Sequence, residues 1–241
     1  MLITSTDNKR IKEVNKLKQK KYRDSENKFI VETLNLIKEA YLEDCLLEVY
    51  VLEDYDLPFD LDVPIYTITE EVMNKIKTIN TSSILGICKK KDSSTYVGKK
   101  YLLLDNIQDP GNIGTILRSS LAFGVDTVVL SSNTCDLYND KVIRASEGAI
   151  FKLNVIREDL KLTINNLNKL EIPVYGTDVN SGDEISTIDK DNYAIIMGSE
   201  GNGISNDIKE IVKSNIYIKT KSVESLNVAV ATSIILYELS K

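Results

Sequence analysis

From residue 101 onward, the sequence alternates between short apolar runs and helical patterns. Short, continuous apolar runs are typical of strands buried on both faces, which occur in parallel sheets covered by helices. We therefore predict an α/β domain built on a parallel sheet. The expected strands are 101–104, 127–130, 151–155, 174–177, 194–197 and 216–218, and the expected helices are 109–124, 140–147, 159–170, 207–214 and 224–239.

A polar run at 89–95 separates this region from a segment of different character, so we predict domains at 1–95 and 96–241. The first is expected to be a small α/β domain. Its expected helices are 8–21, 32–44 and 70–76, and its expected strands are 47–52, 65–68 and 84–88. Because it carries no cluster of residues suited to catalysis, we expect it to bind rather than react.

Composition excludes several kinds of chemistry. The chain has no histidine, so mechanisms that depend on imidazole are ruled out. The three cysteines, Cys45, Cys88 and Cys135, are odd in number and far apart, which favours reduced, structural thiols and no metal site. The first residues lack an apolar signal core, and no stretch approaches the roughly 18 apolar residues of a membrane span. We expect a cytoplasmic protein without a membrane partner.

Charge is distributed unevenly along the chain. Although the net charge is −6, residues 9–28 contain nine basic and three acidic residues, whereas 29–71 contain one basic and twelve acidic. Such a local basic footprint fits a nucleic-acid phosphate backbone, although a solvated helix face explains it equally well. The candidate RNA-binding residues are Lys9, Arg10, Lys12, Lys20, Arg23 and Arg144.

Parallel sheets bind ligands beyond the carboxyl ends of their strands, which directs attention to three loops. The loop at 106–114 carries Asn112, and Arg118 lies on the flank of the helix that follows, from which it can reach a phosphate or a developing oxyanion. A turn residue and a surface arginine are the plain alternatives. The loop at 198–203 has three glycines around Glu200, which allows close approach of backbone to a ligand. The chain contains neither the dinucleotide fingerprint nor a P-loop, which argues against a nicotinamide-dependent oxidoreductase.

The third loop, 220–227, places Ser225 and Asn227 at the start of a helix, where both residue types are also common as simple caps. The helix at 224–239 is apolar on nearly every side, so it must be buried by more than one neighbour. A subunit interface or a central core position would each explain this pattern.

These motifs resemble the SpoU, or TrmH, family of RNA ribose methyltransferases within the SPOUT class. The resemblance rests on 109–114 with Arg118, on 198–205 and on 224–229, and it covers residues 101–241. The N-terminal segment is similar to the small substrate-binding domain of the ribosomal-RNA branch, on 3–5, Asn8, 11–12 and 29–32. Thr33 stands where that domain commonly has glycine, and Ser199 where the methyltransferases usually have asparagine.

The resemblance implies a C-terminal domain with a deep trefoil knot, a homodimer and S-adenosylmethionine as methyl donor to a ribose 2′-hydroxyl. The implied substrate is 23S ribosomal RNA, with transfer RNA or a non-catalytic RNA-binding role as alternatives. The implied catalytic group is Asn112, Arg118, Glu200, Ser225 and Asn227, and the implied cofactor-binding residues are Thr177, Gly198, Gly203, Ile218 and Leu226. Because a guanidinium has a pKa above about 12, we expect Arg118 to stabilise negative charge and anchor a phosphate. Glu200 is then the alternative base, and Ser225 and Asn227 are expected to orient their neighbours.

Overall fold

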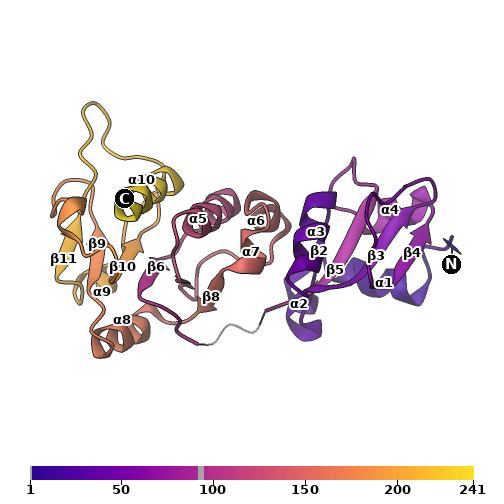
Figure 1. Cartoon of the computed structure of the whole chain (residues 1–241), viewed down its shortest axis with the longest axis horizontal. Coiled ribbons are helices and arrows are strands. Elements are labelled where there is room, and N and C mark those ends of the chain that lie inside the picture. The colour runs from indigo at the N-terminus through magenta and orange to yellow at the C-terminus, as the bar shows by residue number, and fades with distance from the viewer. Residues whose placement is uncertain (1, 92–94) are drawn as a thin grey trace. The chain divides into compact units, whose positions relative to one another are not determined.

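The computed structural model describes residues 2–91 and 95–241 of the chain (Figure 1). The chain forms two compact units. The first comprises Met1–Asp92 together with Asp136–Phe151, and the second comprises Ser93–Cys135 together with Lys152–Lys241. The first unit therefore contains a short stretch of chain that lies between two strands of the second.

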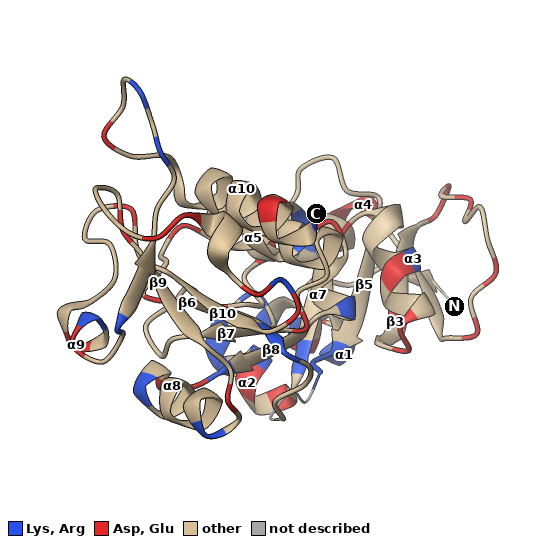
Figure 2. Cartoon of the chain, turned by 60° about the vertical axis from the view of Figure 1, so that its left-hand side comes forward, with Lys and Arg blue, Asp and Glu red and all other residues tan. Residues whose placement is uncertain are grey.

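The first unit is built on a mixed five-stranded sheet in the order β1-β4-β3-β5-β2. Strands β1, β3 and β4 run parallel, whereas β5 runs antiparallel to both β3 and β2. The strands are β1 Leu2–Ile3, β2 Lys28–Val31, β3 Leu46–Leu52, β4 Ile65–Ile68 and β5 Ile84–Lys89, and the helices of 2–91 are α1 Lys9–Lys16, α2 Lys20–Glu26, α3 Leu34–Leu42 and α4 Glu70–Ile76. Basic residues gather over α1 (Figure 2).

The expected helix at 8–21 is divided into α1 and α2. Its pattern of apolar residues continues across the break, but the backbone tightens there, and the N–H groups of Leu17, Lys18 and Gln19 bond to carbonyls three residues earlier. The Arg23 guanidinium donates to the Leu17 and Lys18 carbonyls at 3.0 and 2.8 Å, which satisfies the groups that a continuous helix would have used. Periodicity could not predict this break, because the arginine that stabilises it lies in the next helix.

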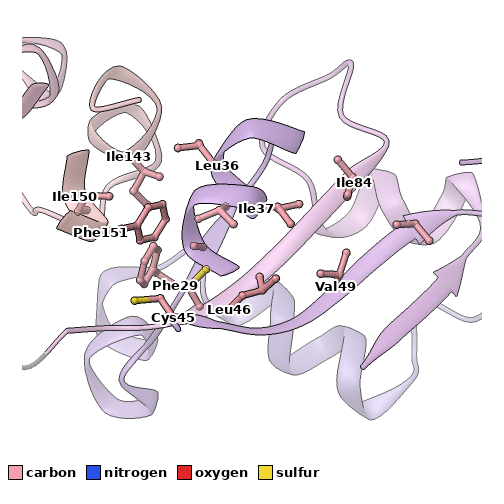
Figure 3. Close-up of a cluster of buried hydrophobic side chains, with 14 residues drawn as sticks. Phe29, Leu36, Ile37, Cys45, Leu46, Val49, Ile84, Ile143, Ile150 and Phe151 are labelled. Atoms are coloured by element: carbon pink, nitrogen blue, oxygen red, sulfur yellow. The ribbon is translucent and has the colours of Figure 1, made fainter. Parts of the chain in front are cut away.

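The core of the first unit includes residues from far along the chain. Helices α6 Asp140–Ala145 and α7 Ala149–Lys152 contribute Ile143, Ile150 and Phe151 to the same buried cluster as Phe29 of β2 (Figure 3). The Phe29 and Phe151 rings stack with centroids 6.1 Å apart. The expected strand at 151–155 is therefore wrong at its start, because Phe151 belongs to α7 and the strand β8 spans Asn154–Arg157.

The second unit has a six-stranded sheet in the order β11-β9-β10-β6-β7-β8, and every neighbouring pair is parallel. The predicted parallel α/β fold class is confirmed. The remaining strands are β6 Lys100–Leu104, β7 Thr127–Leu130, β9 Val174–Thr177, β10 Tyr193–Met197 and β11 Ser214–Ile216, and the remaining helices are α5 Pro110–Ala122, α8 Leu160–Lys169, the 3₁₀ turn η1 Ile185–Thr187, α9 Asn206–Lys209 and α10 Val228–Ser240.

The strand order reverses at β6. From β6 the chain continues to β7 on one side, and it returns later to add β10 on the other side. In parallel α/β sheets, ligand clefts form at the carboxyl edge beside such a reversal. Helix α10 begins at Val228, four residues later than expected, and packs against α5. Within the described residues, no helix is long and apolar enough to cross a membrane.

Candidate active site

Two helix caps place two of the candidate side chains. Asp109 caps α5 by accepting the N–H of Asn112 at 2.8 Å, which fixes Asn112 in the first turn. Asn227 caps α10 through Oδ1, which accepts the N–H groups of Ala229 and Val230 at 2.9 and 3.3 Å. Since Oδ1 is used in this way, Nδ2 of Asn227 must point away from the helix.

The three loops meet at a ring of hydrogen bonds. Glu200 Oε1 accepts from Asn112 Nδ2 at 2.6 Å and from Asn227 Nδ2 at 2.8 Å. Asn227 Nδ2 also donates to Asn112 Oδ1 at 3.1 Å, which closes the ring. The two amides hold one carboxylate oxygen in place. The other, Oε2, accepts no hydrogen bond from the parts of the chain that the structure describes.

Glu200 lies at the tip of a turn that only glycine can form. A Cβ added to Gly198 would lie 2.1 Å from the Gly203 carbonyl carbon and from the Ile204 nitrogen. This close approach allows Ser199 and Gly203 to exchange N–H to carbonyl bonds at 3.0 and 2.8 Å. Gly203 itself has φ +64°, a conformation that favours glycine. The turn is therefore fixed by backbone packing.

A buried carboxylate ties this turn to β6. Asp105 directly follows β6 and is 3% exposed. Its Oδ2 accepts the N–H of Ser205 at 2.7 Å, and its backbone N–H bonds to the Met197 carbonyl at 2.9 Å. Asp105 is not among the site residues predicted from the sequence, although an aspartate directly after a buried strand is a signal that could have drawn attention to it.

A cleft of about 420 Å³ opens beside the ring. Glu200 and Ser225 line it. So do all five predicted cofactor-binding residues, which are Thr177, Gly198, Gly203, Ile218 and Leu226. The hydroxyl of Thr177 donates to the Ile196 carbonyl at 2.9 Å. Thr177 therefore lines the cleft, but its hydroxyl hydrogen is already used within the protein. The loops of β9, β10 and β11 thus surround a single concave site.

Arg118 is the candidate catalytic residue that belongs neither to the lining of the cleft nor to the ring. It is exposed on α5 and is not among the residues that line the cleft. Within 2–91 and 95–241, it has no recorded hydrogen bond or ion pair. On the same helix, Thr115 lines a shallow groove between α5 and α10, which is otherwise formed by α10 residues.

Most of the predicted RNA-binding residues are already paired with carboxylates. The pairs are Arg10 with Glu48, Lys12 with Asp7, Lys20 with Asp24, Arg23 with Asp136, and Arg144 with Asp140. Arg23 is also buried, at 7% exposure, and its guanidinium donates to two backbone carbonyls and to the Asp136 carboxylate. Arg23 is therefore not available to contact RNA. Lys9 is exposed.

Comparison with known proteins identifies the family. Residues 99–237 match the model of the SpoU rRNA Methylase family, and residues 8–86 match an MRM3-like substrate binding domain. The chain belongs to the SpoU rRNA methylase family. It is therefore an RNA methyltransferase that uses S-adenosylmethionine, and the family, the enzyme class and the methyl donor predicted from the sequence are confirmed.

Similar proteins match over almost the whole chain. The 23S rRNA (guanosine(2553)-2′-O)-methyltransferase RlmP of Bacillus subtilis (strain 168) is 33% identical over 98% of both chains. The crystal structure of an AdoMet-bound rRNA methyltransferase from Sinorhizobium meliloti is 25% identical, with a TM-score of 0.86 over 99% of this chain and 97% of that one. An RNA 2′-O ribose methyltransferase structure is 26% identical, with a TM-score of 0.85 over 99% and 98%.

In the described ranges, no group of three or more histidine, cysteine, aspartate or glutamate residues could hold a metal ion.

Proposed function

We propose that this methyltransferase transfers a methyl group to a ribose 2′-hydroxyl of 23S ribosomal RNA in the cytoplasm. The observation that carries the proposal is the ring of Asn112, Glu200 and Asn227, of which Glu200 lines the cleft. It is supported by the RlmP relative, which aligns with both units of the chain. Transfer RNA remains the alternative substrate, and the experiment below separates the two.

The cleft fits S-adenosylmethionine in size and chemistry. Its volume of about 420 Å³ lies within the usual range of small-molecule sites, roughly 300–1,000 Å³. Ile204, Ile218 and Leu226 offer apolar surface for a purine ring, and the bare backbone of the glycine turn offers polar groups without side chains in the way. When bound, the cofactor supplies an electrophilic methyl group on a sulfonium. We propose that the knot implied by the family resemblance closes around this cleft.

Glu200 is our candidate for accepting the proton of the ribose hydroxyl. Its Oε1 is held by two amides, so Oε2 is oriented while remaining available to a substrate. The bound cofactor would supply the methyl group and leave as a neutral thioether, while Oε2 of Glu200 would accept the proton lost by the ribose hydroxyl. Holding the ribose oxygen in line supplies most of the rate. Ser225 lines the same cleft and is proposed to hydrogen-bond the ribose.

Arg118 is proposed to reach the reaction in a homodimer. The face formed by α5 and α10 carries a groove of about 350 Å³ with mostly apolar lining, which includes the exposed side chains of Val230 and Tyr237, and α5 also exposes Leu121. A second copy of the chain would cover this face and explain the all-round apolar character of α10. We propose that the paired arrangement brings Arg118 to a cleft, where its permanent charge stabilises the developing negative charge and anchors a phosphate.

The experiment is methyl transfer from radiolabelled S-adenosylmethionine to protein-free 23S ribosomal RNA transcribed in vitro, with transfer RNA transcripts in parallel. Alkaline hydrolysis then reports the position, because a 2′-O-methylated nucleotide resists cleavage on its 3′ side. We expect label in 23S RNA as an alkali-resistant dinucleotide. Label confined to transfer RNA, or label in an alkali-sensitive nucleotide, would contradict the proposal. Sedimentation of the same preparation is expected to give the mass of a dimer.

A further inference from the structure

The first unit contains a buried carboxylate that holds an exposed loop. Glu32 directly follows β2 and is 4% exposed. It accepts the N–H of Thr78 at 2.6 Å, the Thr78 hydroxyl through its other oxygen, and the more distant N–H of Ile79 at 3.5 Å. The start of the loop between α4 and β5, residues 77–83, is thereby fixed against the end of β2. Residues 78, 80 and 81 of this loop are exposed and carry hydroxyl or amide groups.

Three lysines lie around this loop. Lys18 donates to the Lys75 carbonyl at 2.8 Å, and Lys77 donates to the Asn80 carbonyl at 2.7 Å. Lys75 occupies the last turn of α4, next to both. Burial lowers the pKa of the Lys18 ammonium, and Lys75 lowers it further, while Glu32 opposes the shift. Lys18 and Lys75 therefore lie close enough together to repel one another.

These lysines differ in their partners from several of the basic residues of α1 and α2. Arg10, Lys12 and Lys20 each contact a carboxylate at 2.6–2.7 Å. Lys18, Lys75 and Lys77 have no recorded carboxylate within salt-bridge distance among the residues that the structure describes. Glu32 interacts with Lys18, and its carboxylate oxygens already accept from N–H and hydroxyl donors of the loop. A cation that lacks a protein carboxylate retains its full attraction for phosphate.

We propose that the first unit grips the RNA backbone with Lys18, Lys75 and Lys77 around the loop 77–83, and that Glu32 is the positioning residue that holds this loop in place. The inference rests on the proposed function, since it assigns a surface to the RNA substrate named there. Ammonium groups are compact point charges that suit phosphate contacts, which position an RNA without reading its sequence. The exposed hydroxyl and amide groups of the loop that Glu32 does not bind supply further donors to phosphate or sugar.

The test compares two triple variants with the same change in charge. The first is Lys18→Ala, Lys75→Ala and Lys77→Ala, and the control is Lys38→Ala, Lys169→Ala and Lys190→Ala, all three exposed lysines outside the loop. Binding to the 23S RNA transcript is measured by filter retention at several salt concentrations. Loss of three phosphate contacts is expected to reduce the slope of log affinity against log salt by about 2 to 3 and to weaken binding by about tenfold or more. Equal behaviour of the two variants would overturn the proposal.

Kinetics separate this inference from the proposed function. The first triple variant is expected to raise the KM for RNA while kcat and S-adenosylmethionine affinity stay at the wild-type level. If the wild-type chain binds 23S RNA without methylating it, the proposed function fails, yet the filter comparison still tests the lysines.

The role of Glu32 has its own test. Glu32→Gln keeps the size of the side chain but presents an amide to the loop, so we expect a higher KM for RNA at unchanged kcat. Thr78→Val removes the same hydrogen bond by deleting the hydroxyl that donates to Glu32, and it is also expected to raise the KM for RNA. Lower melting temperatures with no change in either KM would show that Glu32 only stabilises the unit and would overturn its positioning role.

Discussion

The two units use sheets of different kinds, and their function is organised differently as a result. In the all-parallel sheet of the second unit, every strand ends at the same edge, so loops separated by almost a hundred residues converge on Glu200. In the mixed sheet of the first unit, the strands do not all end at one edge. The role that we propose for this unit, RNA binding, depends on charged side chains at its surface. The comparison teaches that ordered motifs predict a site well in a parallel sheet, whereas a run of basic residues says little about which of them are free to bind.

Arg118→Ala tests whether Arg118 takes part in the reaction of the second unit, and it is expected to lower kcat more than any other change considered below. Loss of a group that stabilises developing charge is expected to reduce kcat by about a hundredfold or more, while S-adenosylmethionine still binds the cleft that Arg118 does not line. Single-turnover methylation and calorimetric cofactor titration measure the two effects. Near-normal turnover in the purified variant would remove Arg118 from the mechanism.

Phe151→Ala tests whether the first unit depends on the stretch 136–151. Its side chain is 1% exposed and stacks on Phe29, so truncation is expected to destabilise the protein by about 3–5 kcal/mol. Leu162→Ala, at a side chain that is 58% exposed, is the control and should change stability by less than about 0.5 kcal/mol. Chemical denaturation measures both. A similar small effect for the two variants would mean that 1–92 folds without this stretch.

Asn227→Asp tests the ring without removing the helix cap. The new carboxylate can still accept the Ala229 and Val230 N–H groups, but it places negative charge against Glu200 and cannot donate. We expect kcat to fall by roughly tenfold or more, because two carboxylates at this distance repel one another. The matched control is Asn139→Asp, a cap of α6 far from the ring in sequence, which should retain activity and melting temperature. Loss of activity in both variants would contradict a specific role for the ring.

Gly198→Ala and Gly201→Ala together test whether the glycine turn shapes the cofactor site, and their effect on S-adenosylmethionine affinity is the smallest that we expect. A Cβ at position 198 would collide with the Gly203 backbone at 2.1 Å, whereas a Cβ at position 201 would meet nothing within 4 Å. Displacement of the turn is expected to weaken S-adenosylmethionine binding by about tenfold, equivalent to about 1.4 kcal/mol, for the first variant. The second should bind like wild type. Equal affinities would show that the turn does not shape the cofactor site.

Much of the local structure followed from the sequence. Helix α4 and strand β7 have the predicted bounds, and Pro110 with its aspartate cap marked the start of α5. Elsewhere the prediction failed where a distant partner decides the outcome. The strand expected at 151–155 begins later because Phe151 packs against Phe29, more than a hundred residues away.

The same division applies to the site. The sequence by itself determined which residue types stand at the carboxyl ends of the parallel strands, because strand and helix periods and cap residues are local properties. Only the tertiary structure decided that Asn227 Nδ2 faces Glu200, that Arg118 lies outside the cleft of its own chain, and that Arg23 is buried. It also decided which lysines lack carboxylate partners. Hydrogen bonds and ion pairs depend on distances of a few ångströms between residues far apart in sequence, and no local pattern records those distances.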